Sequence, residues 1–163
     1  IIRRGPEAMS FRANQATFDQ LSERYRREAE AARAQRRQQA QTIIAERWPN
    51  ARSTESGIRY VVSEGGQGAV IRPGNEVTLH YDAYLVDSST PFESTRTTDP
   101  VVVTAGAGRL LPGWEETLVT MRPGERRTII LPPELAFGAR GAGQQVPPNS
   151  FVVFDIEVLS VAR

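Results

Sequence analysis

The sequence predicts an α+β protein: a twisted antiparallel β-sheet wrapped around one short helix and preceded by a long N-terminal helix. Residues 17–47 contain no glycine or proline and are rich in strong helix formers. Segments 77–86 and 151–159 alternate apolar and polar residues with the period of half-buried strands. Residues 112–121 form a single short amphipathic stretch between them. Several strands with one such helix are typical of an α+β domain.

Composition excludes several classes of protein. The 163 residues are 39% hydrophobic and 24% charged, with a net charge of +1, so no global charge favours nucleic acid or an anionic membrane. No apolar run has the length of a membrane span. The absence of cysteine excludes disulfides and a cysteine nucleophile, and it is compatible with both periplasm and cytoplasm.

The N-terminal region divides into an arm and a helix. The chain opens at Ile1, which indicates a processed protein or an excised piece, and residues 1–16 are interpreted as a flexible arm or the end of a preceding domain. A helix is expected over residues 17–48. The sequence from Thr17 to Gln20 has the form of a capping box, and Pro49 disfavours helix at the residue before it.

The expected helix has no continuous apolar face. Residues 33–39 are polar nearly all round, so the apolar side chains gather at the two ends. At roughly 30 residues it would extend about 45 Å, longer than a small domain is wide. A dimerisation helix and a solvated spacer both remain open. Nucleic-acid binding is disfavoured because glutamates dilute the arginines at positions 33, 36 and 37.

A polar linker over residues 49–56 leads into a domain over residues 57–163. Its β runs share apolar alternation or β-branched content and lie at residues 57–62, 77–86, 101–104, 126–131 and 151–159. The short helix lies between the runs at residues 101–104 and 126–131, and it carries an inward stripe of Trp114, Leu118 and Met121 at helical spacing.

The usual catalytic constellations are missing. His80 is the single histidine and lies on the strand face opposite Leu79 and Tyr81, where a structural role is expected. The glycine-rich segment 138–143 lacks the Lys-Ser/Thr of a phosphate-binding loop, and no acidic or histidine cluster has metal-ligand spacing. Neither a metal nor a cofactor is therefore expected.

One family accounts for residues 56–161. The features that carry the resemblance, besides Leu79-His80-Tyr81, are Gly113-Trp114, Pro123-Gly124, Pro132-Pro133-Glu134, the glycine-rich loop 138–143, Pro147-Pro148 and the strand from Phe151 to Leu159. Their order and spacing closely resemble the FKBP family of peptidyl-prolyl cis-trans isomerases. The resemblance implies an FKBP-like sheet over one helix. It also suggests bacterial members of the Mip and FkpA type, whose N-terminal helices form homodimers.

A second, shorter resemblance concerns the N-terminus. The segment from Ile1 to Phe11 is similar to the terminal segment of some bacterial cyclophilin domains, which can be fused to an FKBP domain. This resemblance implies that the chain is the FKBP part of a cyclophilin–FKBP fusion. The alternative is that the segment is a flexible N-terminal arm.

The resemblance implies an apolar pocket for the proline ring. Tyr81, Phe92 and Val101 are the expected walls and Trp114 the floor; Leu110 and Leu111 form one side, Val146 and Phe154 close the far edge, Phe137 lies over the mouth, and Glu93 accompanies Phe92. The Leu111 N–H is expected to donate a hydrogen bond to a substrate carbonyl. The loop 136–146 is expected to overhang this pocket and to influence substrate choice.

Three residues depart from the family pattern. Phe137 stands where the family commonly has tyrosine, so a phenolic donor is missing, a loss of about 0.5–1.5 kcal/mol. Glu93 replaces the usual aspartate, which leaves its contact with the Tyr81 hydroxyl open, and Val101 replaces phenylalanine and widens that wall. The sequence predicts a working isomerase with weakened affinity for macrolide inhibitors.

Prolyl isomerisation needs no nucleophile and no covalent intermediate. The X-Pro bond rotates over a barrier of about 18–20 kcal/mol because twisting destroys amide resonance. A dry apolar pocket and backbone hydrogen-bond donors are therefore sufficient to lower this barrier. The expected partners are proline-containing polypeptides, with an apolar residue before the proline, and the expected role is assistance in folding. The alternatives are a weakly catalytic binding module or chaperone on an FKBP scaffold, or a docking head whose helix carries the principal function.

Overall fold

A computed structural model describes residues 4–163, with side chains from residue 14 onward. The chain divides after Gln39 into two compact units. The long helix α1 (Arg4–Arg47) supplies the first unit and, with its last two turns, the start of the second. No helix within the described part is long and apolar enough to cross a membrane.

Helix α1 begins thirteen residues earlier than the sequence predicted. Residues 4–16, expected as an arm, are helical, and Thr17 lies inside the helix instead of capping it. Pro6 falls in the first turn, where its missing N–H removes no intrahelical hydrogen bond. The capping-box pattern was therefore a local coincidence inside a longer run of helix formers. The expectation for residues 1–3 lies outside the described residues.

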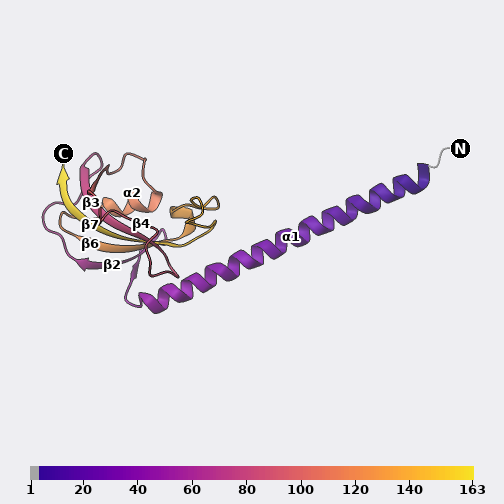
Figure 1. Ribbon diagram of the computed structural model, residues 1–163, viewed down its shortest axis with the longest axis horizontal. Coiled ribbons are helices and arrows are strands. Elements are labelled where there is room, and N and C mark those ends of the chain that lie inside the picture. Colours follow the sequence, from indigo (N-terminus) through magenta and orange to yellow (C-terminus); the bar gives the residue numbers. More distant parts are fainter. Residues whose placement is uncertain (1–3) are drawn as a thin grey trace. The chain divides into compact units, whose positions relative to one another are not determined.

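The second unit is built on an antiparallel sheet (Figure 1). Its elements, in chain order, are β1 (Arg52–Ser53), β2 (Arg59–Glu64), β3 (Glu76–Leu85), β4 (Glu93–Ser94), β5 (Val101–Thr104), α2 (Pro112–Leu118), β6 (Arg126–Leu131), the 3-10 turn η1 (Pro133–Leu135) and β7 (Val152–Ala162). The strand order is β1-β2-β6-β7-β3-β4, and β5 pairs with β3 beside β4. The expected α+β class is confirmed.

The main core lies between α2 and one face of the sheet. Strands β3 and β7 pair along their whole length, from Leu85 opposite Val152 to Glu76 opposite Ala162. Alternation along β7 turns one set of side chains towards α2, where they meet Leu118 of that helix. The members of this set are Val152, Phe154, Ile156 and Val158, and all four are buried.

A second apolar cluster covers the opposite face of the sheet at β6 and β7. Ile130 of β6 and Val153 of β7 are buried there against Ile44 from the end of α1. The Arg47 guanidinium donates a hydrogen bond of 2.7 Å to the Val86 carbonyl oxygen. The compact unit therefore begins at Ala40, ahead of the expected start at residue 57, because the apolar end of the helix is part of its core. Strand β1 also occupies part of the expected linker.

Candidate active site

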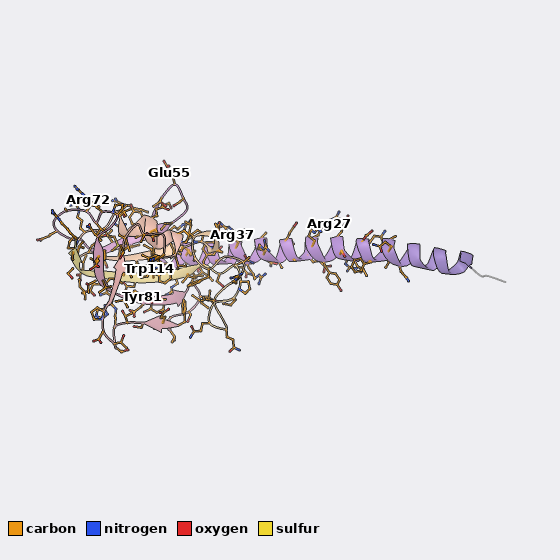
Figure 2. The ribbon with its side chains drawn as sticks, turned by 90° about the horizontal axis from the view of Figure 1, so that it is seen from above. Arg27, Arg37, Glu55, Arg72, Tyr81 and Trp114 are labelled. Carbon is orange, nitrogen blue, oxygen red and sulfur yellow. The ribbon has the colours of Figure 1, made fainter. Side chains whose placement is uncertain are left out.

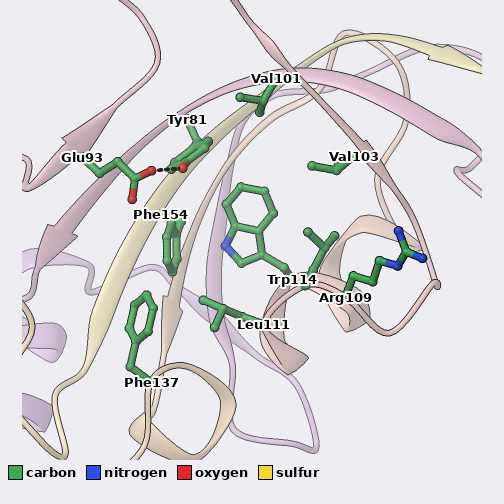
Figure 3. A pocket seen from close by; sticks show the side chains of 10 residues that line it. Tyr81, Glu93, Val101, Val103, Arg109, Leu111, Trp114, Phe137 and Phe154 are labelled. Atoms are coloured by element: carbon green, nitrogen blue, oxygen red, sulfur yellow. Dashed lines mark hydrogen bonds between the residues drawn. The ribbon is translucent and has the colours of Figure 1, made fainter. Parts of the chain in front are cut away.

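A cavity of about 360 Å³ opens over the start of α2 (Figure 3). It is lined mainly by apolar and aromatic side chains from β3, β5, α2 and β7. The lining residues are Tyr81, Glu93, Val101, Val103, Arg109, Leu110, Leu111, Trp114, Phe137 and Phe154. Segments far apart in the sequence thus converge on one apolar concavity.

Trp114 forms the floor of the cavity because α2 packs closely on the sheet. The side chain of Leu131 occupies the space beside Gly113, where an added Cβ would come within 2.4 Å of a Leu131 methyl carbon. The indole, only 5% exposed, meets the ring of Tyr81 edge-on at 5.0 Å and that of Phe154 at 5.3 Å. Tyr81 and Trp114 lie side by side inside the domain (Figure 2). Such edge-to-face pairs hold the rings in defined orientations.

Two N–H groups at the cavity have no acceptor among residues 4–163. The buried Trp114 Nε1 has no hydrogen-bond partner, so packing alone holds the indole. The Leu111 N–H precedes the first turn of α2, and it donates to no atom of the described chain. The Leu111 carbonyl, by contrast, accepts hydrogen bonds from the Trp114 and Glu115 amides. The Leu111 N–H is therefore available to a ligand.

Tyr81 and Glu93 are joined across one wall. The Tyr81 hydroxyl donates a hydrogen bond to a Glu93 carboxylate oxygen, so the longer side chain of glutamate still reaches the phenol. Burial raises the pKa of Tyr81 well above its ordinary value of 10, and the hydrogen bond and negative charge of Glu93 raise it further. The phenol consequently remains protonated at neutral pH and acts as a donor.

A polar network positions the segment that carries Glu93. Asp82 of β3 accepts hydrogen bonds from the Ser94 hydroxyl and, at 2.8 Å, from the Arg96 guanidinium. The same guanidinium donates at 2.9 Å to Glu157 of β7, and this contact lowers the pKa of Glu157. His80 contacts Thr95 through Nδ1 at 3.0 Å and does not line the cavity, in keeping with its expected structural role.

Phe137 reaches the cavity from the loop that follows η1. This loop turns back at Gly141, whose φ of +69° lies in the left-handed region. An added Cβ there would lie 2.3 Å from the Val146 carbonyl oxygen. Val146 itself is only 1% exposed, and its amide and carbonyl exchange hydrogen bonds with Ala142. The loop is thus tightly closed on its own backbone.

A scan against family models matches residues 68–159, more than half of the chain, to the FKBP-type peptidyl-prolyl cis-trans isomerases. The chain belongs to this family. It is accordingly a peptidyl-prolyl cis-trans isomerase of the FKBP type, a class of enzyme that binds proline-containing peptides.

Individual relatives agree with this assignment. The FKBP-type 22 kDa peptidyl-prolyl cis-trans isomerase of Escherichia coli is 34% identical over 141 residues, 81% of this chain and 68% of that protein. FK506-binding protein 2 of Candida glabrata is 42% identical over 92 residues, 56% of this chain and 68% of that protein.

Solved structures support the same fold. FkpA from Escherichia coli superposes with a TM-score of 0.72 at 25% identity, covering 99% of this chain and 74% of its own. AtFKBP13 superposes with a TM-score of 0.64 at 30% identity, covering 69% of this chain and 99% of its own. The long helix together with an FKBP-like sheet thus has a structural counterpart in FkpA.

The cavity of this FKBP-type domain differs from the expected site at four residues. Phe92 is half-buried against the main core and does not line the cavity, because neighbouring side chains of an extended segment point to opposite sides and Glu93 takes the wall. Val146 belongs to the core and does not close the far edge. Val103 and Arg109 line the cavity and were missed. Val103 lies two residues after Val101 on one strand face, a signal the sequence contained, whereas nothing in the sequence marked Arg109.

The lining of the cavity is mainly apolar. Among the described residues, no group of three or more histidine, cysteine or acidic side chains could hold a metal ion. The lining offers a phenol, a carboxylate and a guanidinium at its edges and hydrocarbon elsewhere. This arrangement suits the burial of an apolar ring beside a few hydrogen-bonding groups.

Proposed function

We propose that the cavity over Trp114 is the isomerase site and that it accelerates X-Pro rotation in flexible or unfolded polypeptides, thereby assisting folding. The observation that carries the proposal is the indole floor, framed by Tyr81 and Phe154 at ring distances of 5.0 and 5.3 Å within an apolar concavity. A proline ring buried there leaves water, and its imide bond enters a poorly solvated environment. The planar, polar imide loses more solvation free energy in this environment than the twisted transition state does, so the barrier to rotation falls.

Hydrogen bonding supplies the second contribution. The Leu111 N–H, which has no acceptor in the described chain, is proposed to donate to a substrate carbonyl and so to orient the peptide across the floor. Each tenfold acceleration requires about 1.4 kcal/mol of preferential transition-state stabilisation. The aromatic walls and one backbone donor are proposed to supply several such tenfold accelerations, with no covalent intermediate.

The direct test is catalysed isomerisation of a Leu-Pro tetrapeptide, followed by NMR exchange between the cis and trans signals. We expect catalysis of this peptide, because Leu110 and Leu111 offer an apolar side to the residue that precedes the proline. Absence of catalysis, with peptide binding retained, would favour the alternative of a proline-segment binding module. The valine at position 101 and the missing phenol at Phe137 are the observations that keep this alternative open.

The same assay with a macrolide such as FK506 tests the departures from the family pattern. We expect inhibition weakened by up to about tenfold per lost hydrogen bond, because Phe137 offers no hydroxyl to a bound carbonyl. The variant Phe137→Tyr restores this donor and should strengthen inhibition. Equal inhibition of the two proteins would show that the missing phenol has no part in ligand binding.

We propose further that α1 forms a homodimer through an apolar patch in its N-terminal half. Phe18, Leu21 and Tyr25 recur at helical spacing and are 65%, 45% and 69% exposed. Their spacing places them on one side of the helix, where a second copy of the chain can cover them. FkpA, which is similar to this chain over 99% of its length, supports a common helical architecture.

Light scattering of the full chain tests the dimer. The wild-type protein should show twice the mass of one chain, and Phe18→Ser with Tyr25→Ser should lower it to one. The exposed Gln20 on the same helix provides the matched control, because Gln20→Ser removes a polar side chain and should leave the mass unchanged. A wild-type mass equal to one chain at all concentrations argues for the spacer interpretation.

A further inference from the structure

The rim of the cavity carries one cation that the isomerase chemistry does not use. Arg109 lines the cavity, yet its side chain is exposed, and it forms no ion pair with any residue of the described chain. A free guanidinium at the edge of an otherwise apolar cavity is a recognition group for a carboxylate. Its presence beside the hydrocarbon walls implies a ligand with both an apolar and an acidic part.

The opposite rim carries the opposite charge. Glu93 lies across the indole of Trp114 from Arg109 (Figure 3), and its carboxylate accepts the hydrogen bond of the Tyr81 hydroxyl. A peptide whose proline ring rests on the indole therefore has one neighbouring residue near a guanidinium and the other near a carboxylate. This asymmetry distinguishes the two flanks of the proline by charge.

Glu115 fixes the loop from which Arg109 extends. One carboxylate oxygen of Glu115 accepts a hydrogen bond of 2.7 Å from the Gly106 amide, and the other accepts one of 3.2 Å from the Leu110 amide. This acidic side chain, the nearest in sequence to Arg109, is thus directed to backbone amides. The backbone on both sides of Arg109 is held, so the charge is presented at a defined place on the rim.

From these contacts we infer that Arg109 selects substrates with an acidic side chain next to the proline, on the flank that lies away from Glu93. The inference rests on the proposed isomerase site and specifies its substrate class. A carboxylate on that flank is attracted by Arg109, whereas a carboxylate on the other flank is repelled by Glu93. Lysine at the same positions has the reverse preference.

Four peptides test the selection: glutamate or lysine immediately before the proline, and glutamate or lysine immediately after it. NMR exchange measures their isomerisation without a coupled protease, whose own specificity would mask the effect. We expect the wild-type protein to favour glutamate over lysine by about two- to fivefold at one position only, the range of a partly exposed ion pair. In about 1 M salt, where the Debye length is about 3 Å, the ratio should approach one.

Variants assign the preference to one side chain. Arg109→Gln should bring the glutamate-to-lysine ratio to about one, and Arg109→Glu should invert it; because each ratio is taken within one protein, a uniform loss of activity cancels. Arg72 is an exposed arginine on a loop that does not line the cavity (Figure 2), and Arg72→Gln should keep the wild-type ratio.

Equal rates for glutamate and lysine at both positions overturn the inference, and so does a ratio that Arg109→Gln leaves unchanged. The salt series needs no variant and tests whether the preference is electrostatic, so a ratio that persists in about 1 M salt also overturns the inference. Failure of the proposed isomerase site is a separate result, seen as no catalysis of a Leu-Pro peptide. In that case NMR titrations of the same four peptides measure binding, and equal affinities refute the role of Arg109.

Discussion

Replacing Trp114 with leucine is expected to lower the catalytic efficiency towards a Leu-Pro peptide by about 10- to 100-fold, or about 1.4–2.7 kcal/mol of transition-state stabilisation. The indole is the surface on which the proline ring is proposed to rest, and it orients Tyr81 and Phe154 through edge-on contacts. Trp114→Phe keeps an aromatic floor and should fall between wild type and Trp114→Leu. Activity is measured well below the melting temperature, and NMR spectra verify that the fold is retained.

The second tryptophan of the chain is the matched control for this substitution. Trp48 is half-buried against the cluster on the opposite sheet face and lies outside the cavity. Trp48→Leu should lower the free energy of unfolding while leaving the isomerisation rate of the folded protein unchanged. Unchanged activity in Trp114→Leu, or an equal loss of activity in both variants, would contradict an active site built on the indole.

Removing the Glu125 carboxylate is expected to have the largest effect on stability. Glu125 and Arg127 form a buried ion pair, with their side chains 6% and 11% exposed and a hydrogen bond of 2.7 Å from Arg127 Nε. Arg127 also donates to the Thr120 hydroxyl at 2.8 Å and lies over the Tyr60 ring at 5.0 Å. Glu125→Ala leaves this guanidinium buried without its counter-charge, at a cost of about 3 kcal/mol or more.

Urea unfolding measures this cost as a lower midpoint at an unchanged slope. Glu55 is exposed on the loop before β2, and Glu55→Ala should change the free energy of unfolding by no more than about 0.5 kcal/mol. Glu125→Gln retains an acceptor of similar shape and should lie between the two. A loss below about 1 kcal/mol in Glu125→Ala would show that water or the Thr120 contacts compensate for the missing charge.

Much of the candidate site followed from the sequence through the spacing of its motifs. Tyr81, Trp114 and Phe154 were expected together, and the structure brings them together because β3, α2 and β7 meet in one core. Their convergence depends on strand alternation, which is a local pattern, and on the packing of α2 against the sheet, which is not. Phe92 was assigned to a wall and Val146 to the far edge without a test of side-chain direction; Phe92 packs against the core and Val146 is buried inside it.

Helix limits and polar contacts were less predictable. The capping pattern at Thr17 is a signal of a few residues, and the helix formers on both sides of it outweighed it, so that α1 begins at Arg4. The contact between Glu93 and the Tyr81 hydroxyl depends on how the β4 segment is held by Asp82 and Arg96. Glutamate is one methylene longer than aspartate, and these supporting contacts determine whether the longer side chain reaches the hydroxyl.

The sequence by itself determined the fold class through its periodicities and the family through its motif spacings, and the resemblance to that family implied the aromatic centre of the candidate site. Tertiary structure alone decided which side chains border the cavity, placed Arg109 opposite Glu93, and made the end of α1 part of the domain core. The physical reason is that the position of α2 on the sheet and the placement of distant charges opposite one another arise only when separate segments pack, and no local pattern encodes them.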